Sequence, residues 1–207
     1  MEELVKAIAD LDEEAATKLV REMLQKGEDP LKIVDLCRKG LDVVGQRYEA
    51  MEYFLSQLVL AADIFQKITD MIAPKLKGRK AQIRGKVVLG TVQGDIHDMG
   101  KNLVAMLLRM NGFEVYDLGV DVPPKAFVDK VKGTGSNIVA MSGLLTIAWD
   151  AMKETVEELK IAGLKSKVKI MIGGGTTNDS VVKFVGADAL GKTTVDAVKL
   201  AIEWSEK

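Results

Sequence analysis

The sequence contains very little cysteine and histidine. Of its 207 residues, only Cys37 is a cysteine and only His97 is a histidine. A lone cysteine cannot close a disulfide within the chain, and a conventional zinc site needs three or four protein ligands, chiefly cysteine and histidine. Both a disulfide framework and an ordinary zinc centre are therefore excluded. The scarcity of cysteine is typical of a cytoplasmic protein, and we expect that compartment.

Net charge and long apolar runs are lacking as well. The formal charge is −1 at pH 7, so the chain offers no strong positive field to attract nucleic acid. No segment approaches the roughly 20 consecutive apolar residues of a membrane-spanning helix. We therefore expect neither nucleic acid nor a membrane among its partners.

The hydrophobic residues that are present follow two different periods. Up to about residue 77 they recur at helical spacing, as Leu4, Ile8 and Leu11 do. Asp29 and Pro30 form a helix-start signature within this part, which reads as four helices with short connections. The basic stretch "KLKGRKAQIRGK" then ends the helical pattern, and we expect a helical domain over residues 1–80 and a second domain over residues 81–207.

In the second part, short apolar runs alternate with helical stretches. The runs are "KVVLGTV", "FEVYDLG", "SNIVAMSGLL", "VKIMIGG" and "ADAL". Such runs are typical of parallel strands buried on both faces, which need crossover helices. The helices are expected near residues 100–111, 124–132, 147–162, 178–185 and 194–205. The sequence therefore predicts an α/β domain with a five-stranded parallel sheet.

Ligands of such sheets bind beyond the carboxyl ends of the strands, so the loops after strands one, three and four are the candidate site. These loops hold "QGDIHDMGKN", "MSGLLT" and "IGGGTT". His97 lies in the first of them, two residues after Asp95. In one interpretation Asp95 caps the helix that begins near Asp98, and His97 is an ordinary loop residue.

Two other loop functions fit the residues poorly. A phosphate-binding loop has four residues between its glycines and Ser or Thr after its lysine, whereas five residues separate Gly94 from Gly100 and Asn102 follows Lys101. A phospho-acceptor receiver domain needs an aspartate after strand three, where "MSGLL" stands. A single imidazole can hold a metal when a macrocycle supplies the other donors, and a carboxylate at Asp95 would then orient and tune the His97 ring.

The stretch "GTVQGDIHDMGKNLV" resembles the D-x-H-x-x-G signature of cobalamin-binding domains in corrinoid methyltransferase proteins and in methionine synthase. "SGLLT" resembles the S-x-L element after strand three, and "GGG" at residues 173–175 resembles the glycine element after strand four. "RYEAMEYFLSQLVLAAD" is similar to the cap bundle that precedes the cobalamin domain in stand-alone corrinoid proteins. The resemblance implies a four-helix cap followed by a flavodoxin-like, Rossmann-type sheet.

The resemblance also implies a cofactor and its contacts. The cofactor would be cobalamin, in its methyl or hydroxo form, with His97 as the lower ligand of cobalt. Ser142 and Thr146 would offer polar contacts, Leu144 an apolar wall, and Gly173 and Gly174 room for the nucleotide tail. The cofactor-binding residues implied are Gly94, Asp95, Ile96, His97, Asp98, Met99, Gly100, Ser142, Leu144, Thr146, Gly173, Gly174, Gly191 and Phe54.

Phe54 has a second interpretation. With Tyr53, Leu55, Leu58 and Ile64 it has helical spacing, which by default indicates bundle core. The resemblance instead assigns Phe54 to the upper face of the corrin, where it would shield the methyl group.

Two positions depart from the family pattern. Members of the family commonly place a hydroxyl six residues after the S-x-L serine, where it completes a His-Asp-hydroxyl relay, but this chain has Ala148 there. We expect Asp95 to meet water or another hydroxyl instead. The segment "ADALGKTTVDAV" after strand five also differs from the aromatic-bearing form usual in the family, and the resemblance implies a cofactor contact at Gly191 within it.

The function implied by the resemblance is that of a non-catalytic methyl carrier in one-carbon metabolism. It would accept a methyl group from a substrate-specific methyltransferase and donate it to an acceptor methyltransferase of the tetrahydrofolate or thiol type, with a reductive activator as a third partner. Two alternatives stay open. A cobalamin-dependent sensor would need an output domain, and a mutase subunit would need a substrate-binding barrel.

Overall fold

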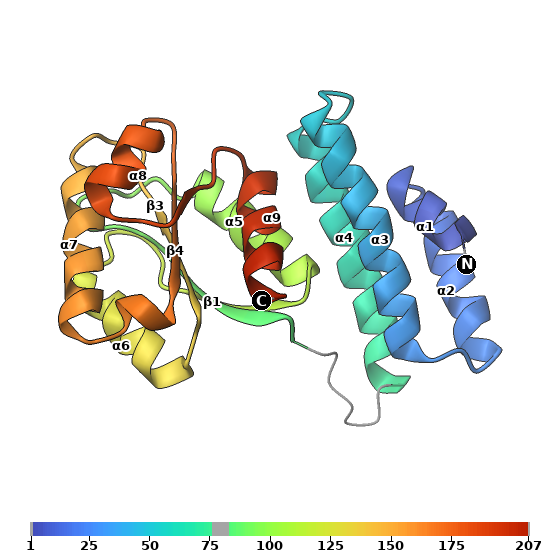
Figure 1. The fold of residues 1–207 in the computed structure, drawn as a ribbon. Coiled ribbons are helices and arrows are strands. Elements are labelled where there is room, and N and C mark those ends of the chain that lie inside the picture. Colours follow the sequence, from blue (N-terminus) through green and yellow to red (C-terminus); the bar gives the residue numbers. More distant parts are fainter. Residues whose placement is uncertain (1, 76–82, 207) are drawn as a thin grey trace. The chain divides into compact units, whose positions relative to one another are not determined.

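The chain forms two compact units, Met1–Gln82 and Ile83–Lys207, in a computed structural model (Figure 1). The structure describes residues 2–75 and 83–206. The domain boundary expected between residues 80 and 81 lies outside the described residues.

The first unit consists of helices, and the expected four are present. They are α1 (Glu2–Ala9), α2 (Glu13–Gln25), α3 (Pro30–Glu49) and α4 (Leu55–Ile72), followed by a short 3-10 turn at Ala73–Lys75. The side chain of Asp29 accepts a hydrogen bond from Leu31 N, and Pro30 is the first helical residue, so this start signature is confirmed. The helical spacing was wrong at Leu11, which has a left-handed backbone (φ +59°) in the turn after α1.

Branched aliphatic side chains fill the core of this unit. The largest fully buried ones are Leu4, Ile8, Ile33, Leu58, Ile64, Ile68 and Ile72. Gly40 lets α1 and α3 approach closely, because a Cβ atom at this position would lie 2.5 Å from Cβ of Ile8. Cys37 is buried among these helices, and burial raises the pKa of its thiol to about 12.

The core interpretation holds for only part of the stripe that begins at Tyr53. Leu58 and Ile64 are buried, whereas Leu55 is exposed and Phe54 is 65% exposed within the described residues. Phe54 and Leu55 stand at the very start of α4. Helical spacing shows which residues share a face, but it does not show how far a neighbouring helix extends along that face.

The second unit contains the expected five-stranded parallel sheet. Its strands are β1 (Gly85–Thr91), β2 (Phe113–Asp117), β3 (Ile138–Ser142), β4 (Lys169–Gly173) and β5 (Ala189–Leu190). They are arranged in the order β2-β1-β3-β4-β5. This is the flavodoxin-like order, and the predicted fold class is confirmed.

Helices cover both faces of this sheet. They are α5 (Met99–Met110), α6 (Pro124–Thr134), α7 (Ala148–Ile161), α8 (Asp179–Val185) and α9 (Thr194–Ser205), with a short 3-10 turn at Lys165–Lys167. Figure 1 shows α5 and α9 on one face and α6, α7 and α8 on the other. Among the described residues, no helix is both long and apolar enough to cross a membrane.

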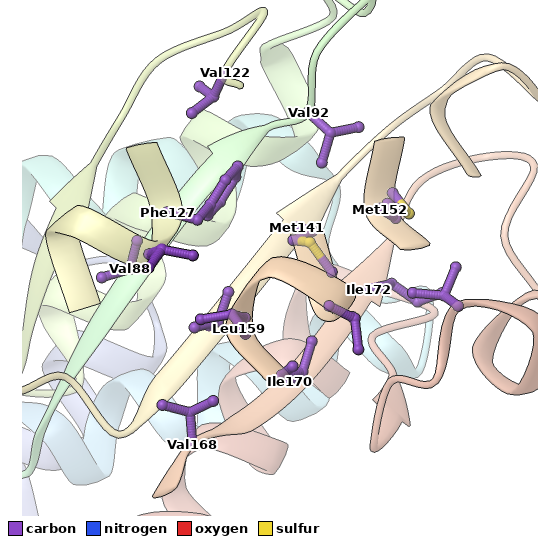
Figure 2. Close-up of a cluster of buried hydrophobic side chains, with 14 of the residues drawn as sticks. Val88, Val92, Val122, Phe127, Met141, Met152, Leu159, Val168, Ile170 and Ile172 are labelled. Carbon is purple, nitrogen blue, oxygen red and sulfur yellow. The ribbon is translucent and has the colours of Figure 1, made fainter. Parts of the chain in front are cut away.

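A buried cluster fixes the sheet against α6, α7 and α8. Val88, Met141 and Ile170 project from three adjacent strands toward Phe127 of α6 and Met152 of α7 (Figure 2). The crossovers that follow β1 and β3 lie on opposite faces of the sheet, and ligands of such sheets generally bind beyond the carboxyl ends of the strands at this point. The fold thus brings the loops after β1 and β3 to one edge of the sheet.

Gly40 provides a test of the packing in the first unit. Replacing it with alanine places a Cβ atom 2.5 Å from Cβ of Ile8 and 2.9 Å from the carbonyl oxygen of Val5. We expect Gly40→Ala to lower the free energy of unfolding of this unit by about 1–3 kcal/mol, because α1 and α3 must separate. Thermal unfolding followed by circular dichroism measures the effect.

The matched control is Gly133→Ala in α6, where the added Cβ atom meets nothing within 4 Å. Alanine favours helix over glycine by about 1 kcal/mol, so this variant should be neutral or slightly stabilised. Equal unfolding temperatures for Gly40→Ala and the wild type would contradict the close packing of α1 on α3.

Candidate functional site

The residues expected at the site gather at the carboxyl end of the sheet. Gly94 to Asp98 form the loop between β1 and α5, and Met99 and Gly100 begin α5. Ser142 ends β3, with Leu144 and Thr146 in the loop that follows, and Gly173 ends β4. Gly191 directly follows β5, where its N–H donates to the carbonyl of Ile172. Phe54 belongs to the first unit.

A buried carboxylate joins the loops after β1 and β3. Asp95 is only 1% exposed. Its Oδ1 accepts from the backbone N–H of His97 (3.0 Å) and lies 2.7 Å from Nδ1 of the His97 ring. Its Oδ2 accepts from the backbone N–H groups of Leu144 (2.6 Å) and Leu145 (3.0 Å). One side chain therefore fixes the imidazole and holds the second loop at the same time.

These contacts keep Asp95 ionised. Burial raises the pKa of the carboxyl group, but the hydrogen bonds from His97, Leu145 and Leu144 together lower it by more, to about 2. At neutral pH the ionised carboxylate can only accept hydrogen bonds, so Nδ1 of His97 carries the ring proton toward it. The lone pair of the neutral ring is then on Nε2.

His97 is held by its backbone as well as by its ring. The hydroxyl of Thr91, which is fully buried at the end of β1, donates to the carbonyl oxygen of His97 (2.8 Å). The His97 side chain is 50% exposed. The imidazole thus has a fixed inner nitrogen and an accessible outer nitrogen, which is the arrangement of a metal ligand with a supporting carboxylate.

The helix-cap interpretation of Asp95 is wrong. Asp95 does not cap the following helix: Asp98 is the residue before α5, and its carboxylate accepts from Asn102. The second oxygen of the Asp95 carboxylate accepts from the backbone N–H groups of Leu144 and Leu145, and among the described residues no hydroxyl donates to it. Ala148, at the position of the family's hydroxyl, is buried, and a water partner of Asp95 stays a prediction.

The glycines after β4 allow the loops to approach one another. Gly174 has a left-handed backbone (φ +133°), and any side chain there would collide with the carbonyl oxygen of Gly143. A Cβ atom on Gly173 would lie 3.0 Å from the carbonyl oxygen of Gly191. Close contact between loops therefore requires glycine here, and the room that these residues would give a nucleotide tail remains a prediction.

Exposed apolar side chains lie on the loop that carries His97, at the start of α5 and on the loop after β3. Ile96 is 74% exposed and Met99 is 78% exposed, and Leu144, Leu145 and Ile147 of the loop after β3 are also exposed. Single exposed apolar residues are ordinary, but a group of them beside a fixed polar residue marks a ligand or partner site. Ser142 is half-buried and Thr146 is exposed beside this apolar group.

The donor set agrees with a metal that arrives within a macrocycle. In residues 2–75 and 83–206, no group of three or more His, Cys, Asp or Glu side chains is placed to hold a metal ion. His97, the single histidine of the sequence, offers an accessible ring nitrogen with a supporting carboxylate. A corrin ring supplies four nitrogen donors to cobalt and needs one protein ligand, so the residues present fit a corrinoid.

Sequence reasoning missed four residues that build this site. Leu145 acts through its backbone N–H, which no sequence pattern reveals. Thr91 could have been noticed as a polar residue that ends an otherwise apolar strand. Asp121, whose carboxylate accepts from Gly94 N (2.8 Å), lies in the loop after strand two. This loop was not among the three loops expected to form the site. Lys101 was considered only as part of a phosphate loop, but it is buried against Asp117.

Both units match family models. A model described as "B12 binding domain" matches residues 85–199, and a second model with the same description matches residues 1–72. Together they span most of the chain.

Similar proteins support the same family. The chain is 37% identical to trimethylamine corrinoid protein 1 of Methanosarcina acetivorans, covering 93% of this chain and 90% of that protein. A crystal structure of a cobalamin-binding protein from Desulfitobacterium hafniense matches with a TM-score of 0.85 and 40% identity, over 97% of this chain and 96% of that one.

A chain of the methanol:cobalamin methyltransferase complex MtaBC from Methanosarcina barkeri matches with a TM-score of 0.85 and 29% identity, over 99% of this chain and 78% of that one. The two family models, the relatives and the Asp95–His97 pair in the first loop agree with one another. The chain therefore belongs to the family of two-domain, B12-binding corrinoid proteins of methyltransferase systems.

Proposed function

We propose that this chain carries methyl groups on cobalamin, with His97 as the lower ligand of cobalt. The observation that carries the proposal is the His97 ring, whose Nδ1 is fixed by the buried carboxylate of Asp95 while Nε2 stays accessible. When bound, the corrinoid supplies a cobalt centre that can accept and release a methyl group, a chemistry that protein side chains lack.

The protein residues orient and tune this ligand. Asp95 selects the tautomer of His97 and raises the basicity of its outer nitrogen. Thr91 and the N–H groups of Leu144 and Leu145 hold the pair in place, so the ring loses little freedom when it binds. We assign no catalytic residue to the chain itself, since binding and orientation are the roles these side chains support.

We infer the other contacts with the cofactor from where the residues lie in the loops at the carboxyl end of the sheet. Ile96, Met99 and Leu144 offer exposed apolar surface to the corrin ring. Gly94, Asp98 and Gly100 complete the loop around His97, and Ser142 and Thr146 offer hydroxyl groups. Gly173, Gly174 and Gly191 stand where the nucleotide tail would pass the strand ends.

Phe54 is the proposed cap residue. It is 65% exposed at the start of α4, with Met51 and Leu55 exposed beside it. Its N–H donates to the side chain of Gln57 (2.9 Å), which fixes its backbone. An exposed aromatic ring on a fixed backbone suits a residue that shields the reactive face of the cofactor.

Three protein partners follow from this function. Relatives are named for trimethylamine and dimethylamine, and another is a chain of a methanol:cobalamin methyltransferase complex. We infer that a methyltransferase specific for a small methylated amine or alcohol donates the methyl group. A tetrahydrofolate- or thiol-type methyltransferase in the cytoplasm accepts it, and a reductive activator restores the carrier after accidental oxidation.

Replacing the ligand tests the proposal directly. We expect the wild type to bind hydroxocobalamin and to show the absorption bands of histidine-ligated cobalt. His97→Ala should lose these bands, because no other histidine exists in the chain to replace the ligand. Ultraviolet-visible spectra of the two reconstituted proteins measure the difference.

The control for this experiment is Gln93→Ala, an exposed residue of the same loop. It should have the wild-type spectrum. A wild type that retains no cobalamin, or a His97→Ala variant with unchanged bands, would refute the assignment of His97.

Asp95 gives a prediction for pH dependence. Its pKa is about 2 in the folded protein, below the value of about 3.9 for an unfolded chain. A lowered pKa stabilises the fold above pH 4, and this contribution, about 2–3 kcal/mol, is lost as the pH falls through 2. Asp95→Asn should therefore be less stable at pH 7, and its deficit relative to the wild type should shrink toward pH 3. Urea unfolding at several pH values measures this.

The exposed carboxylate of Asp129 in α6 supplies the control. Asp129→Asn should be within about 0.5 kcal/mol of the wild type, as surface substitutions usually are. A stability deficit of Asp95→Asn that stays constant between pH 7 and pH 3 would show that the carboxylate charge is not its source.

A further inference from the structure

Residues 118–122, in the loop between β2 and α6, lie against the loop that carries His97. The backbone N–H of Thr91 donates to the carbonyl of Gly119 (3.0 Å), and the N–H of Val122 donates to the carbonyl of Thr91 (3.0 Å). Val92 and Val122 also form a parallel bridge. The 118–122 loop therefore continues the pairing of β1 past the end of the strand.

Asp121 is the residue through which this loop reaches the His97 loop. Its carboxylate accepts from the backbone N–H of Gly94 (2.8 Å), and its own N–H donates to the carbonyl oxygen of Asp95 (2.9 Å). Asp121 thus binds the backbone on both sides of the Gly94–Asp95 peptide. This is the peptide that directly precedes the side chain on which the orientation of His97 depends.

The backbone of Asp121 supports a dedicated role. Its φ is +52°, in the left-handed region that side chains other than Asn and Asp rarely adopt. Its carboxylate does not cap the next helix, since Pro123 occupies the N-cap of α6 without a side-chain hydrogen bond. The side chain instead reaches a residue 27 positions earlier in the sequence.

The beginning of the same loop is anchored on the other side of His97. Asp117, at the end of β2, forms an ion pair with Lys101 of α5 (2.7 Å), and Lys101 is buried. The other oxygen of Asp117 accepts from the N–H of Gly119 (2.9 Å). The two ends of the loop therefore hold the chain before His97, at Gly94, and after it, at Lys101.

We propose that Asp121 is a positioning residue for the lower ligand. Through the Gly94–Asp95 peptide it sets the placement of the Asp95 carboxylate, and through that carboxylate the tautomer and direction of the His97 ring. The inference rests on the proposed function of His97, but its geometry belongs to the protein alone. It does not require Asp121 to touch the cofactor.

Four variants separate the hydrogen bond that the Asp121 carboxylate accepts from the effect of the left-handed backbone at this position. Asp121→Asn keeps both the acceptor oxygen and the tolerance for a left-handed backbone. Asp121→Gly keeps the backbone but loses the acceptor, and Asp121→Ala loses both. Asp129→Ala removes an exposed carboxylate from α6 and serves as the control for charge.

Two measurements are made on each variant. The first is equilibrium binding of hydroxocobalamin, with the histidine-ligated fraction read from the absorption spectrum. The second is the ¹⁵N spectrum of protein labelled only at histidine, without cofactor, which gives one imidazole because His97 is the sole histidine. Its two nitrogen shifts report which nitrogen carries the proton, and thermal unfolding confirms that each variant is folded.

We expect Asp121→Ala and Asp121→Gly to bind hydroxocobalamin about 10–100-fold more weakly, as is usual when the support of a metal ligand is removed. Both should also lose the preference for a proton on Nδ1. Asp121→Asn should stay close to the wild type, and Asp129→Ala should equal it. Wild-type affinity and wild-type ¹⁵N shifts in Asp121→Gly would overturn the proposal.

A defect in Asp121→Ala that is absent from Asp121→Gly would also overturn it, because backbone strain alone would then be responsible. A different result would refute the proposed function of the site. If the wild type shows a single Nδ1-protonated imidazole but binds no hydroxocobalamin, the proposed function is wrong while the positioning of His97 by Asp121 is still tested by the ¹⁵N shifts.

Discussion

The site depends on one buried negative charge. A carboxylate that is only 1% exposed is costly to bury unless its oxygens are fully hydrogen-bonded, and Asp95 meets that requirement with four N–H groups from three residues. Because these donors come from the loops after β1 and β3, satisfying the charge also assembles the site. The same hydrogen bonds that stabilise the carboxylate orient His97.

This arrangement differs from a relay that ends on a side-chain hydroxyl. In place of a rotatable hydroxyl, Oδ2 of Asp95 meets the backbone N–H groups of Leu144 and Leu145, while the position expected to carry the hydroxyl is the buried Ala148. Backbone N–H groups only donate, and they are present whatever the side chain unless the residue is proline. The carboxylate is therefore held by the fold of the β3 loop, which in turn needs glycine at position 174 to pass beside Gly143.

The site combines a rigid interior with an exposed apolar surface. Hydrogen bonds of Thr91, Asp95 and Asp121 fix the chain around His97, while the side chains of Ile96 and Met99 are exposed to solvent. Burying such apolar surface gains about 25 cal/mol per Å², so a large flat ligand that covers it would add affinity to a single metal–nitrogen bond. Orientation and affinity thus come from different residues.

The sequence by itself determined the order and type of nearly all elements. The 3.6-residue period of helices and the short apolar runs of strands buried on both faces are local patterns that can be read from neighbouring residues. The sequence also located His97 in the loop after the first strand and Ser142 and Gly173 at the ends of two others, since parallel connectivity forces those ends to one edge. Only the tertiary structure decided what Asp95 bonds to, that Phe54 is exposed rather than core, and that Asp121 supports the Gly94–Asp95 peptide. Those facts depend on backbone groups and on residues distant in sequence, whose approach no local pattern encodes.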